Sequence, residues 1–336
     1  MTSEFQRKMP ILLITLGDVA GIGPEIVVRA WAALCENAQP VVVGDPDWLR
    51  AGSQLVSRQL EIVPVTSVSG IRATPALCPC ICASQAQLKQ VIRGTVSAAA
   101  GQAAYDFLVD AIARTMRGEA DAIVTAPLHK EGLHAAGINE PGHTEILAEH
   151  TKTKSFAMVL YGDGIAVAHV TLHMALRDVF QHLTIAAILE KIRLLQTLLP
   201  KLDKPNPRIG VAALNPHAGD GGLFGTEEAD IIAPAVRLAQ NEGILASGPW
   251  PADTLFVHAA QGAYDGIVAM YHDQGHIAMK LRSGRRCVNI SAGLPIIRTS
   301  VAHGTAYDIA GKNLADESSL IAAAQVAAQL VRARSL

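Results

Sequence analysis

The stretch Asp265–Lys280, DGIVAMYHDQGHIAMK, carries the strongest single indication of architecture in this chain. Its apolar run 267–270 follows Gly266, which predicts a short buried strand of a mostly parallel sheet. The residues His272, Asp273, Gln274, Gly275 and His276 come directly after this run. Ligands of open α/β sheets bind in the crevice at the carboxyl ends of the strands, so we expect chemistry here. Lys280 follows closely enough to face the same site.

Two further histidines also follow predicted strands. His173 comes after the alternating segment 165–171, and His217 comes after the apolar segment 209–214. Three imidazoles with an open fourth position suit a catalytic Zn²⁺ or a similar divalent ion. The alternative for each histidine is a structural role, because a single histidine is commonly a satisfied structural residue.

Length and composition indicate a globular protein of about two domains. The chain has 336 residues, of which 50% are hydrophobic and 17% charged, so it can bury a large core and is not expected to be disordered. The formal net charge of −2, without a long basic run, gives no electrostatic footprint for nucleic acid. We therefore expect a small, anionic ligand held by a few local cations.

Neither export nor membrane insertion is indicated. The polar segment 3–10 precedes an apolar run, 11–16, that is too short for a signal sequence. Five cysteines, an odd number, fit a reducing cytoplasm, and the Cys78-Pro-Cys-Ile-Cys82 segment lacks the spacing of a zinc knuckle. We expect a cytoplasmic protein in which 78–82 is a strand or loop segment.

Strands and helices alternate along the chain, which predicts an α/β fold with two domains meeting at a cleft. The first unit joins strand 11–16 to a helix, 24–35, through a glycine-rich turn. Its glycines do not match the dinucleotide fingerprint, so this turn is either a tight connection or a substrate-site loop. A long helix is expected over 95–117, and the next strand, 122–125, leads to His129 and Lys130, which are either site residues or a plain helix start.

Anion-binding groups are predicted at a helix start and near two later strands. The Pro141-Gly-His-Thr-Glu145 segment opens a helix, whose free N–H groups attract negative charge, so His143 and Thr144 either bind an anion or cap the helix. Asn289 and Arg298 lie near strand ends, and arginine suits bidentate contact with carboxylate or phosphate. The loop 302–311, rich in glycine and polar residues, could wrap an adenosine.

These motifs together resemble the family of 4-hydroxythreonine-4-phosphate dehydrogenases, with its D-threonate and D-erythronate 4-phosphate branch. The resemblance covers nearly the whole chain and rests on GHTE (142–145), TLHMALRD (171–178), NPHAGD (215–220), PADTLF (251–256), MYHDQG (270–275) and RTSVAHGT (298–305). It implies a homodimer with the active site at its interface. It also implies an isocitrate/isopropylmalate dehydrogenase-like fold, with domain 1 over 1–142 and 291–336 and domain 2 over 143–290.

The resemblance also implies roles for particular residues. The metal ligands are His173, His217 and His272, drawn from both protomers. The substrate contacts are His143, Thr144, Lys280, Asn289 and Arg298. The loop that resembles an adenosine-binding loop contributes His303, Gly304, Thr305 and Asp308. The implied cofactors are NAD or NADP and one divalent metal, zinc first, with magnesium, cobalt, manganese or nickel as alternatives.

The implied reaction is metal-dependent, NAD(P)-linked oxidation and decarboxylation of a 4-phosphorylated four-carbon hydroxy acid. Either Asp273 or Lys280 moves the protons, and the residues do not choose between them. Relatives in pyridoxine synthesis usually carry Leu-Pro where this chain has His276-Ile277. A partly cationic His276 near C2 of the substrate would favour threonate or erythronate 4-phosphate, although a surface position is an equal alternative.

Two other classes of function fit some of the same residues. A metal-dependent hydrolase would use the three histidines but not an adenosine loop. A non-catalytic phosphoacid-binding protein would keep His143 and Arg298 without a metal.

Overall fold

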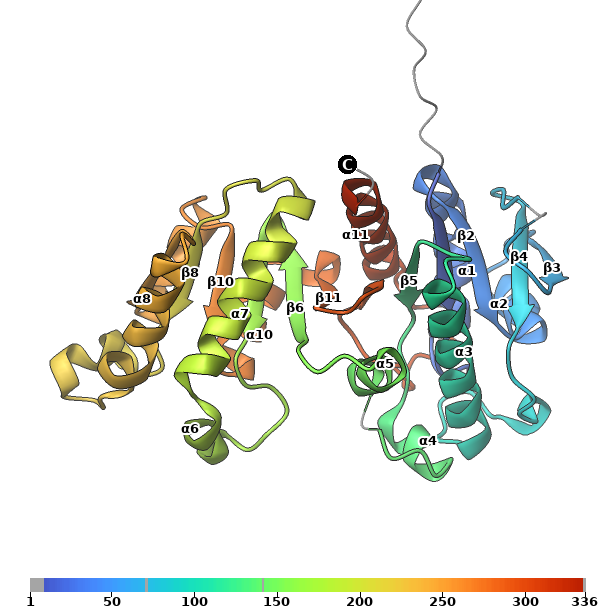
Figure 1. The fold of residues 1–336 in the computed structure, drawn as a ribbon. Helices are drawn as coiled ribbons and strands as arrows, with labels where there is room; N and C mark the ends of the chain where they lie inside the picture. The colour runs from blue at the N-terminus through green and yellow to red at the C-terminus, as the bar shows by residue number, and fades with distance from the viewer. Residues whose placement is uncertain (1–8, 70–71, 141, 335–336) are drawn as a thin grey trace, which may run out of the picture. The chain divides into compact units, whose positions relative to one another are not determined.

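The computed structural model describes residues 9–69, 72–140 and 142–334. The chain divides into two compact units, which differ in the strand directions of their sheets (Figure 1). Unit 1 comprises Met1–Lys154 and Leu294–Leu336, and unit 2 comprises Ser155–Gly293. The sequence placed the domain changes at 142/143 and 290/291, so the helix that starts at His143 falls in unit 1 instead of the second domain.

Unit 1 contains a parallel sheet with strand order β3-β4-β2-β1-β5-β12. Its strands are β1 (Ile11–Thr15), β2 (Gln39–Gly44), β3 (Glu61–Val65), β4 (Leu77–Cys82), β5 (Ala122–Thr125) and β12 (Ile297–Val301). β1 and β5 are almost fully buried, which agrees with the continuous apolar runs expected for central parallel strands. The cysteine segment 78–82 lies within β4, as the strand alternative predicted.

The helices of unit 1 begin at recognisable signals. They are α1 (Gly23–Asn37), α2 (Pro46–Leu55), α3 (Ala98–Met116), α4 (Lys130–Ala135), α5 (His143–Thr151) and α11 (Ser318–Arg334), with a short 3₁₀ segment η1 (Leu88–Gln90). Pro24 stands in the first turn of α1, and the Ser97 hydroxyl accepts a hydrogen bond from Ala100 N at the start of α3. The long helix predicted over 95–117 is confirmed, with slightly shorter ends.

Unit 2 contains a mixed sheet with strand order β11-β6-β7-β10-β8-β9. Its strands are β6 (Ala157–Gly162), β7 (Ile165–His169), β8 (Ile209–Ala212), β9 (Ala246–Trp250), β10 (Gly266–Ala269) and β11 (Val288–Ala292). β6 and β7 form an antiparallel hairpin, and β7, β10 and β8 run parallel to one another. The three strands that precede the candidate histidines are therefore neighbours, which brings their carboxyl ends to one edge.

The helical segments of unit 2 are α6 (Val179–His182), α7 (Ile185–Leu198), α8 (Ala233–Asn241), α9 (Ala252–Ala260) and α10 (His272–Ser283). Shorter segments are η2 (Leu176–Asp178), η3 (Leu199–Leu202), η4 (Pro216–Gly222), η5 (Glu228–Ile232) and η6 (Gly284–Arg286). The 3₁₀ turn η2 directly precedes the single α-turn α6. The π-turn η5 leads directly into α8. β9 was not predicted, because its glycine and proline hide the strand pattern.

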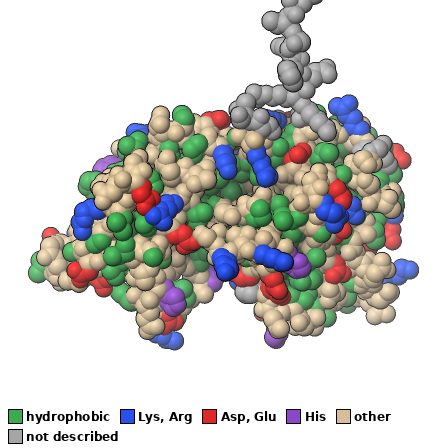
Figure 2. All heavy atoms as spheres, viewed as in Figure 1, with side chains coloured by type: hydrophobic (Ala, Val, Ile, Leu, Met, Phe, Trp, Pro, Cys, Tyr) green, Lys and Arg blue, Asp and Glu red, His purple; other side chains and the backbone are tan. Residues whose placement is uncertain are grey.

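Two further features of the described residues concern the charged surface and the helices. On the part of the face in Figure 2 that the structure describes, Lys and Arg side chains are interspersed with Asp and Glu. No helix of the described residues is long and apolar enough to cross a membrane. Four histidines, His169, His173, His272 and His276, lie close together after the parallel strands β7 and β10 of unit 2.

Candidate active site

The motif after β10 starts a helix instead of forming a loop. α10 begins at His272, and Gln274 braces the turn, since its Oε1 accepts from Met270 N at 2.7 Å and its Nε2 donates to Ala213 O at 2.7 Å. A Cβ on Gly275 would lie 2.3 Å from Nε2 of His169, so only glycine permits this approach. The sequence HDQG therefore docks the start of α10 against the ends of β7, β8 and β10.

Asp273 orients the ring of His272. The His272 Nδ1 and Asp273 Oδ1 atoms lie 2.7 Å apart, and since a carboxylate only accepts, Nδ1 carries the proton. The opposite nitrogen, Nε2, then keeps its lone pair. A histidine held by a carboxylate in this way is the arrangement typical of metal-ligating histidines.

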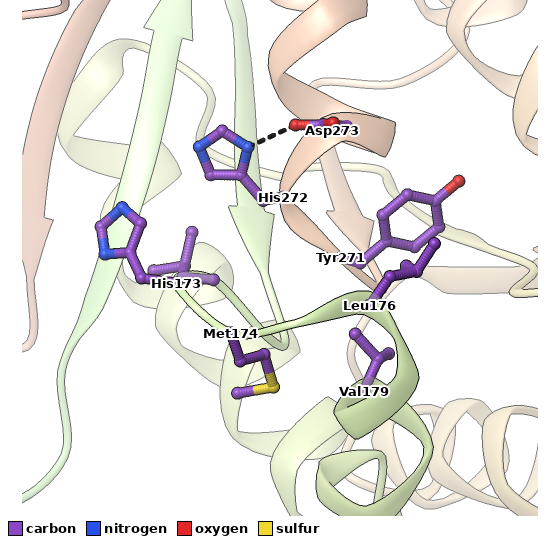
Figure 3. A pocket seen from close by; sticks show the side chains of 8 residues that line it. His173, Met174, Leu176, Val179, Tyr271, His272 and Asp273 are labelled. Atoms are coloured by element: carbon purple, nitrogen blue, oxygen red, sulfur yellow. Dashed lines mark hydrogen bonds and ion pairs between the residues drawn. The ribbon is translucent and has the colours of Figure 1, made fainter.

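His173 and His272 turn toward the same pocket (Figure 3). Their ring centroids lie 5.8 Å apart, and the pocket has a volume of about 370 Å³. It is lined by Leu172, His173, Met174, Leu176, Val179, Tyr271, His272 and Asp273. In Figure 3 the His173 and His272 rings lie on one side and the Tyr271 ring on the other, with Met174 and Val179 below them.

His169, the last residue of β7, was overlooked as a site residue. It is buried, and its Nε2 lies 3.2 Å from Nδ1 of His276, which also lies 3.1 Å from the backbone oxygen of His272. Burial, reinforced by the neighbouring histidines, lowers the pKa of His169 to about 3 and that of His276 to about 4. The available sequence signal was the position of His169 near the end of the alternating segment 165–171.

Two sequence-based interpretations of His276 are wrong. The residue does not lie on the surface, since only 8% of it is exposed and its ring stacks on that of His272. It is also not a partly cationic neighbour for the substrate, because burial and the nearby His272 lower its pKa to about 4. Helical spacing puts 276 one turn after 272 on the same face, and the packing of His276 against His169 of β7 buries it.

His217 lies on a separate, unusual loop. Residues 217–221 in η4 all have positive φ, including His217 (52°), Ala218 (56°) and Asp220 (44°), a conformation that costs energy for residues other than glycine. The buried Glu228 carboxylate anchors the loop, as its Oε1 accepts from Leu214 N and Asn215 N, both at 2.8 Å. His217 itself is exposed.

The donor set for a metal is partial within one chain. Among the described residues, no group of three or more His, Cys, Asp or Glu side chains is arranged to hold an ion. His173 and His272 converge on one pocket, whereas His217 is not brought into such a group. Two imidazoles beside an open pocket fit part of a divalent-ion site.

Unit 1 holds the predicted anion-binding residues around β12. Arg298, the second residue of β12, is 3% exposed, and its Nη2 donates to the Thr125 hydroxyl at 2.6 Å. Burial lowers the pKa of Arg298 to about 9, with Glu145 acting in the opposite direction, so the guanidinium stays cationic at neutral pH. A buried guanidinium has the charge and the donor geometry to bind an anion.

α5 begins at His143 without a side-chain cap among the described residues; Pro141 lies outside them. The simple capping role for Thr144 is therefore not supported, since Gly142 is the N-cap. His143 keeps some exposed surface, yet it sits so deep among protein atoms that burial, with Arg298 as a further cause, places its pKa well below the usual value. A neutral His143 at a helix N-terminus is suited to donate a hydrogen bond to an anion.

The remaining predicted substrate residues, Lys280 and Asn289, belong to unit 2. Lys280 is exposed on the third turn of α10. Asn289 lies on β11, and its Oδ1 is buried without a hydrogen-bond partner among the described residues. An unmet buried acceptor of this kind is compatible with a ligand donor.

The loop 302–311, which was predicted to bind adenosine, exposes one side to solvent and packs its other side against the protein. His303, Gly304 and Asp308 are exposed, whereas Thr305 is buried and its backbone oxygen accepts from Ile22 N at 3.0 Å. The glycine-rich turn 17–23 thus packs behind this loop and is more than a tight connection. Lys130 starts α4 as an exposed residue, and His129 stacks on Tyr307 at 4.6 Å between ring centroids.

Unit 2 thus has a histidine-lined pocket after parallel strands, and unit 1 has a buried arginine on β12 and an uncapped helix start at His143. These features define the class of α/β proteins whose polar side chains gather at the carboxyl ends of parallel strands, where such proteins bind their ligands. The chain belongs to the PdxA family: the family model for "Pyridoxal phosphate biosynthetic protein PdxA" matches residues 36–327.

Curated relatives carry two different names. A 4-hydroxythreonine-4-phosphate dehydrogenase of Beijerinckia indica is 44% identical over 319 residues, which are 95% of this chain and 94% of that protein. A D-threonate 4-phosphate dehydrogenase of Salmonella typhimurium is also 44% identical over 319 residues, 94% of this chain and 98% of that protein. Overall identity therefore does not separate the two activities.

The same family appears among solved structures. The crystal structure of 4-hydroxythreonine-4-phosphate dehydrogenase from Klebsiella pneumoniae matches with a TM-score of 0.87 and 41% sequence identity, covering 96% of this chain and 99% of that one. The resemblance inferred from the six motifs is thus confirmed at the level of sequence and of fold.

Proposed function

We propose that this protein oxidises a 4-phosphorylated four-carbon hydroxy acid with NAD⁺ or NADP⁺, with loss of CO₂, and depends on a divalent metal. The observation that carries the proposal is the convergence of His173 and His272 on one pocket, with His272 oriented by Asp273. Membership of a family whose relatives are named as dehydrogenases of such phosphates supports it.

The metal would be held by His173 and His272, with His217 as the third ligand from the same or the other protomer. When bound, a divalent ion supplies Lewis acidity that lowers the pKa of a substrate hydroxyl and favours negative charge on oxygen. Zinc is our first choice because the donors are imidazoles, and magnesium is the least suited of the alternatives.

The phosphate end of the substrate is assigned to Arg298 and the start of α5. The guanidinium offers a planar fork of donors, and the uncapped N–H groups at His143 and Thr144 add donors aligned with the helix dipole. Lys280 and Asn289 complete the proposed contacts. Because Oδ1 of Asn289 lacks a partner among the described residues, a donor on the substrate would satisfy it.

We assign the proton transfer to Lys280 in preference to Asp273. The Asp273 carboxylate already accepts from Nδ1 of His272, so its role is to position that ring. Lys280 lies on the exposed surface of the same helix, two turns later, and is free to approach a substrate.

The cofactor is assigned to the exposed edge of the loop 302–311, at His303, Gly304 and Asp308. The homodimer with a shared site, the isocitrate/isopropylmalate dehydrogenase-like domain arrangement and the cytoplasmic location remain predictions. Sedimentation equilibrium tests the dimer, and a monomer with full activity would exclude a shared site.

The most specific part of the proposal is the identity of the phosphorylated acid that is oxidised. We place C2 of the substrate near the buried, neutral His276. Because desolvating a cation is costly, a hydroxyl at C2 is tolerated there better than an ammonium group. We therefore propose D-threonate or D-erythronate 4-phosphate. The resulting place in metabolism is sugar-acid breakdown instead of pyridoxine synthesis.

One assay tests both the proposed reaction and the choice of acid. Reduction of NAD⁺ or NADP⁺ is followed with 4-hydroxy-L-threonine 4-phosphate, D-threonate 4-phosphate and D-erythronate 4-phosphate, each with Zn²⁺, Mn²⁺ or Mg²⁺ added. We expect the highest kcat/KM with one of the hydroxy acids. Preference for the amino acid would overturn the choice of acid alone. Release of phosphate without cofactor reduction would instead indicate a hydrolase, and binding without turnover a phosphoacid-binding protein.

A further inference from the structure

The segment after β1 holds the loop 302–311 at three points within unit 1. The Tyr307 hydroxyl donates to Asp18 Oδ2 at 2.7 Å, and Ile22 N donates to Thr305 O at 3.0 Å. The backbone N–H of Gly311 donates to Glu25 Oε1. Two hydrogen bonds to carboxylates and one backbone–backbone hydrogen bond therefore join residues about 290 positions apart in sequence.

Both carboxylates are buried. Asp18 is 0% exposed and Glu25 is 2% exposed. Oδ1 of Asp18 accepts from Ala20 N at 2.8 Å, so each of its oxygens has a partner. Burial raises the pKa of Asp18, while Tyr307, Ala20 and His129 act in the opposite direction. Burying a carboxylate costs free energy unless it is hydrogen-bonded, which gives these bonds to the loop their importance.

Other segments close the back of the loop. His129 stacks on Tyr307 with ring planes 11° apart, and its Nδ1 is buried without a partner among the described residues. Gly94, at φ +75°, donates from its N–H to Ala20 O at 2.8 Å, and a Cβ there would lie 2.8 Å from Tyr307 O. Tyr307 is thus enclosed by segments around residues 18, 94 and 129.

The front of the loop is free. His303, Gly304 and Asp308 are exposed, and nothing lies within 4 Å of a Cβ built on Gly304. A loop that is fixed behind and open in front loses little conformational entropy when it binds a ligand. The same geometry places exposed backbone and an acidic side chain where a ribose hydroxyl could be bound.

We propose that Asp18 and Glu25, through Tyr307 and the Gly311 N–H, are positioning residues that hold the loop 302–311 in the form that binds the adenosine part of the nicotinamide cofactor. This inference rests on the proposed function. Neither carboxylate contacts the cofactor in this arrangement, and their effect is on cofactor affinity. We call the hydrogen bonds from Tyr307 to Asp18 and from Gly311 to Glu25 the clamp. The metal-binding and phosphate-binding residues are not part of it.

Tyr307→Phe is the main test, because it removes one hydroxyl and keeps the ring that stacks on His129. We expect the Kd for NAD⁺ or NADP⁺, measured by isothermal titration calorimetry, to rise about ten-fold, the order expected for losing a hydrogen bond to a charged group. The KM for the phosphorylated acid and the kcat at saturating cofactor should stay within about two-fold of wild type, since those contacts are elsewhere. A purely structural role would change all of these together.

Matched variants separate the clamp from general stability. Tyr105→Phe removes a hydroxyl that lies 3.0 Å from Nε2 of His150 on an exposed part of unit 1, and it should leave the Kd unchanged. Glu25→Gln keeps an acceptor for Gly311 and should bind the cofactor nearly as well as wild type, whereas Glu25→Ala should not. Melting temperatures of all variants show which of them remain folded.

The outcomes are distinct. Wild type that binds the cofactor, with an unchanged Kd in Tyr307→Phe, overturns the clamp and leaves the proposed function standing. Wild type that binds neither NAD⁺ nor NADP⁺ with metal present overturns both. A raised Kd in Tyr307→Phe and Glu25→Ala, with Tyr105→Phe and Glu25→Gln unchanged, supports the clamp.

Discussion

The imidazole rings of His272 and His276 stack with centroids 3.6 Å apart and planes 11° apart. Nδ1 of His276 lies 3.1 Å from the backbone oxygen of His272 and 3.2 Å from Nε2 of His169. Since a carbonyl oxygen only accepts, this nitrogen carries the proton, and His169 is the second acceptor. His276 therefore supports one face of the His272 ring, while Asp273 holds its Nδ1.

His276→Leu should weaken metal binding by about ten-fold, because residues that orient a metal ligand typically contribute that much or more to affinity. The substitution removes the stack and the hydrogen bond but keeps a side chain of similar burial. Competition with a chelator of known affinity measures the change. His258→Leu, on the exposed face of α9, is the control and should bind metal as wild type does. Equal affinities in both variants would remove His276 from this role.

The three predicted ligands should each be needed for metal occupancy. His173→Ala, His217→Ala and His272→Ala are expected to lose most bound Zn²⁺ and nearly all turnover, since a three-histidine site loses a third of its donors in each. Bound metal is measured by mass spectrometry of elements after dialysis. A variant that retains full occupancy and full turnover shows that its histidine is not a ligand. This test bears most directly on His217, which lies on its own loop.

Arg298→Lys should lower kcat/KM about ten-fold or more. Lysine keeps the charge but loses the planar fork, and a charge-assisted hydrogen bond contributes about 1.5–3 kcal/mol. Steady-state kinetics with the phosphorylated acid measures the loss. Arg117→Lys, which changes an exposed pair with Glu119 in unit 1, is the matched control. An unchanged kcat/KM in Arg298→Lys would exclude Arg298 from the phosphate site.

Stability should fall as pH drops below the ordinary pKa of histidine, partly because of His143. Burial keeps the pKa of His143 well below 6.5 in the folded protein, so only the unfolded chain takes up this proton as pH falls through 6.5. Each such proton lowers the free energy of unfolding by about 1.4 kcal/mol per pH unit. Urea unfolding at pH 7.5 and 5.5 measures the loss in wild type and in His143→Gln.

We expect the loss over that interval to be smaller by about 1 kcal/mol in His143→Gln, since glutamine binds no proton. His134→Gln, which changes an exposed histidine in α4, should lose as much stability as wild type. A slope in His143→Gln equal to that of wild type would show that His143 is not kept neutral by the fold.

Local sequence patterns predicted much of the fold. The apolar run before His272 is a strand because four consecutive apolar residues bounded by glycine suit a buried parallel position, and β10 confirms it. The start of α5 at His143 follows from the glycine before it. The family was also recognisable, since six motifs at fixed positions together are more specific than any one of them.

Sequence by itself determined the strands that end at histidines, the helix starts and the family, because these depend on neighbours within a few residues. The burial of His276, the site position of His169 and the Asp18–Tyr307 hydrogen bond were decided only by tertiary structure. Each of these joins segments more than a hundred residues apart, and hydrophobic periodicity carries no information on which distant segments meet. A histidine after a strand looks the same in sequence whether it faces water or a second histidine, and only the parallel pairing of β7 with β10 decides which.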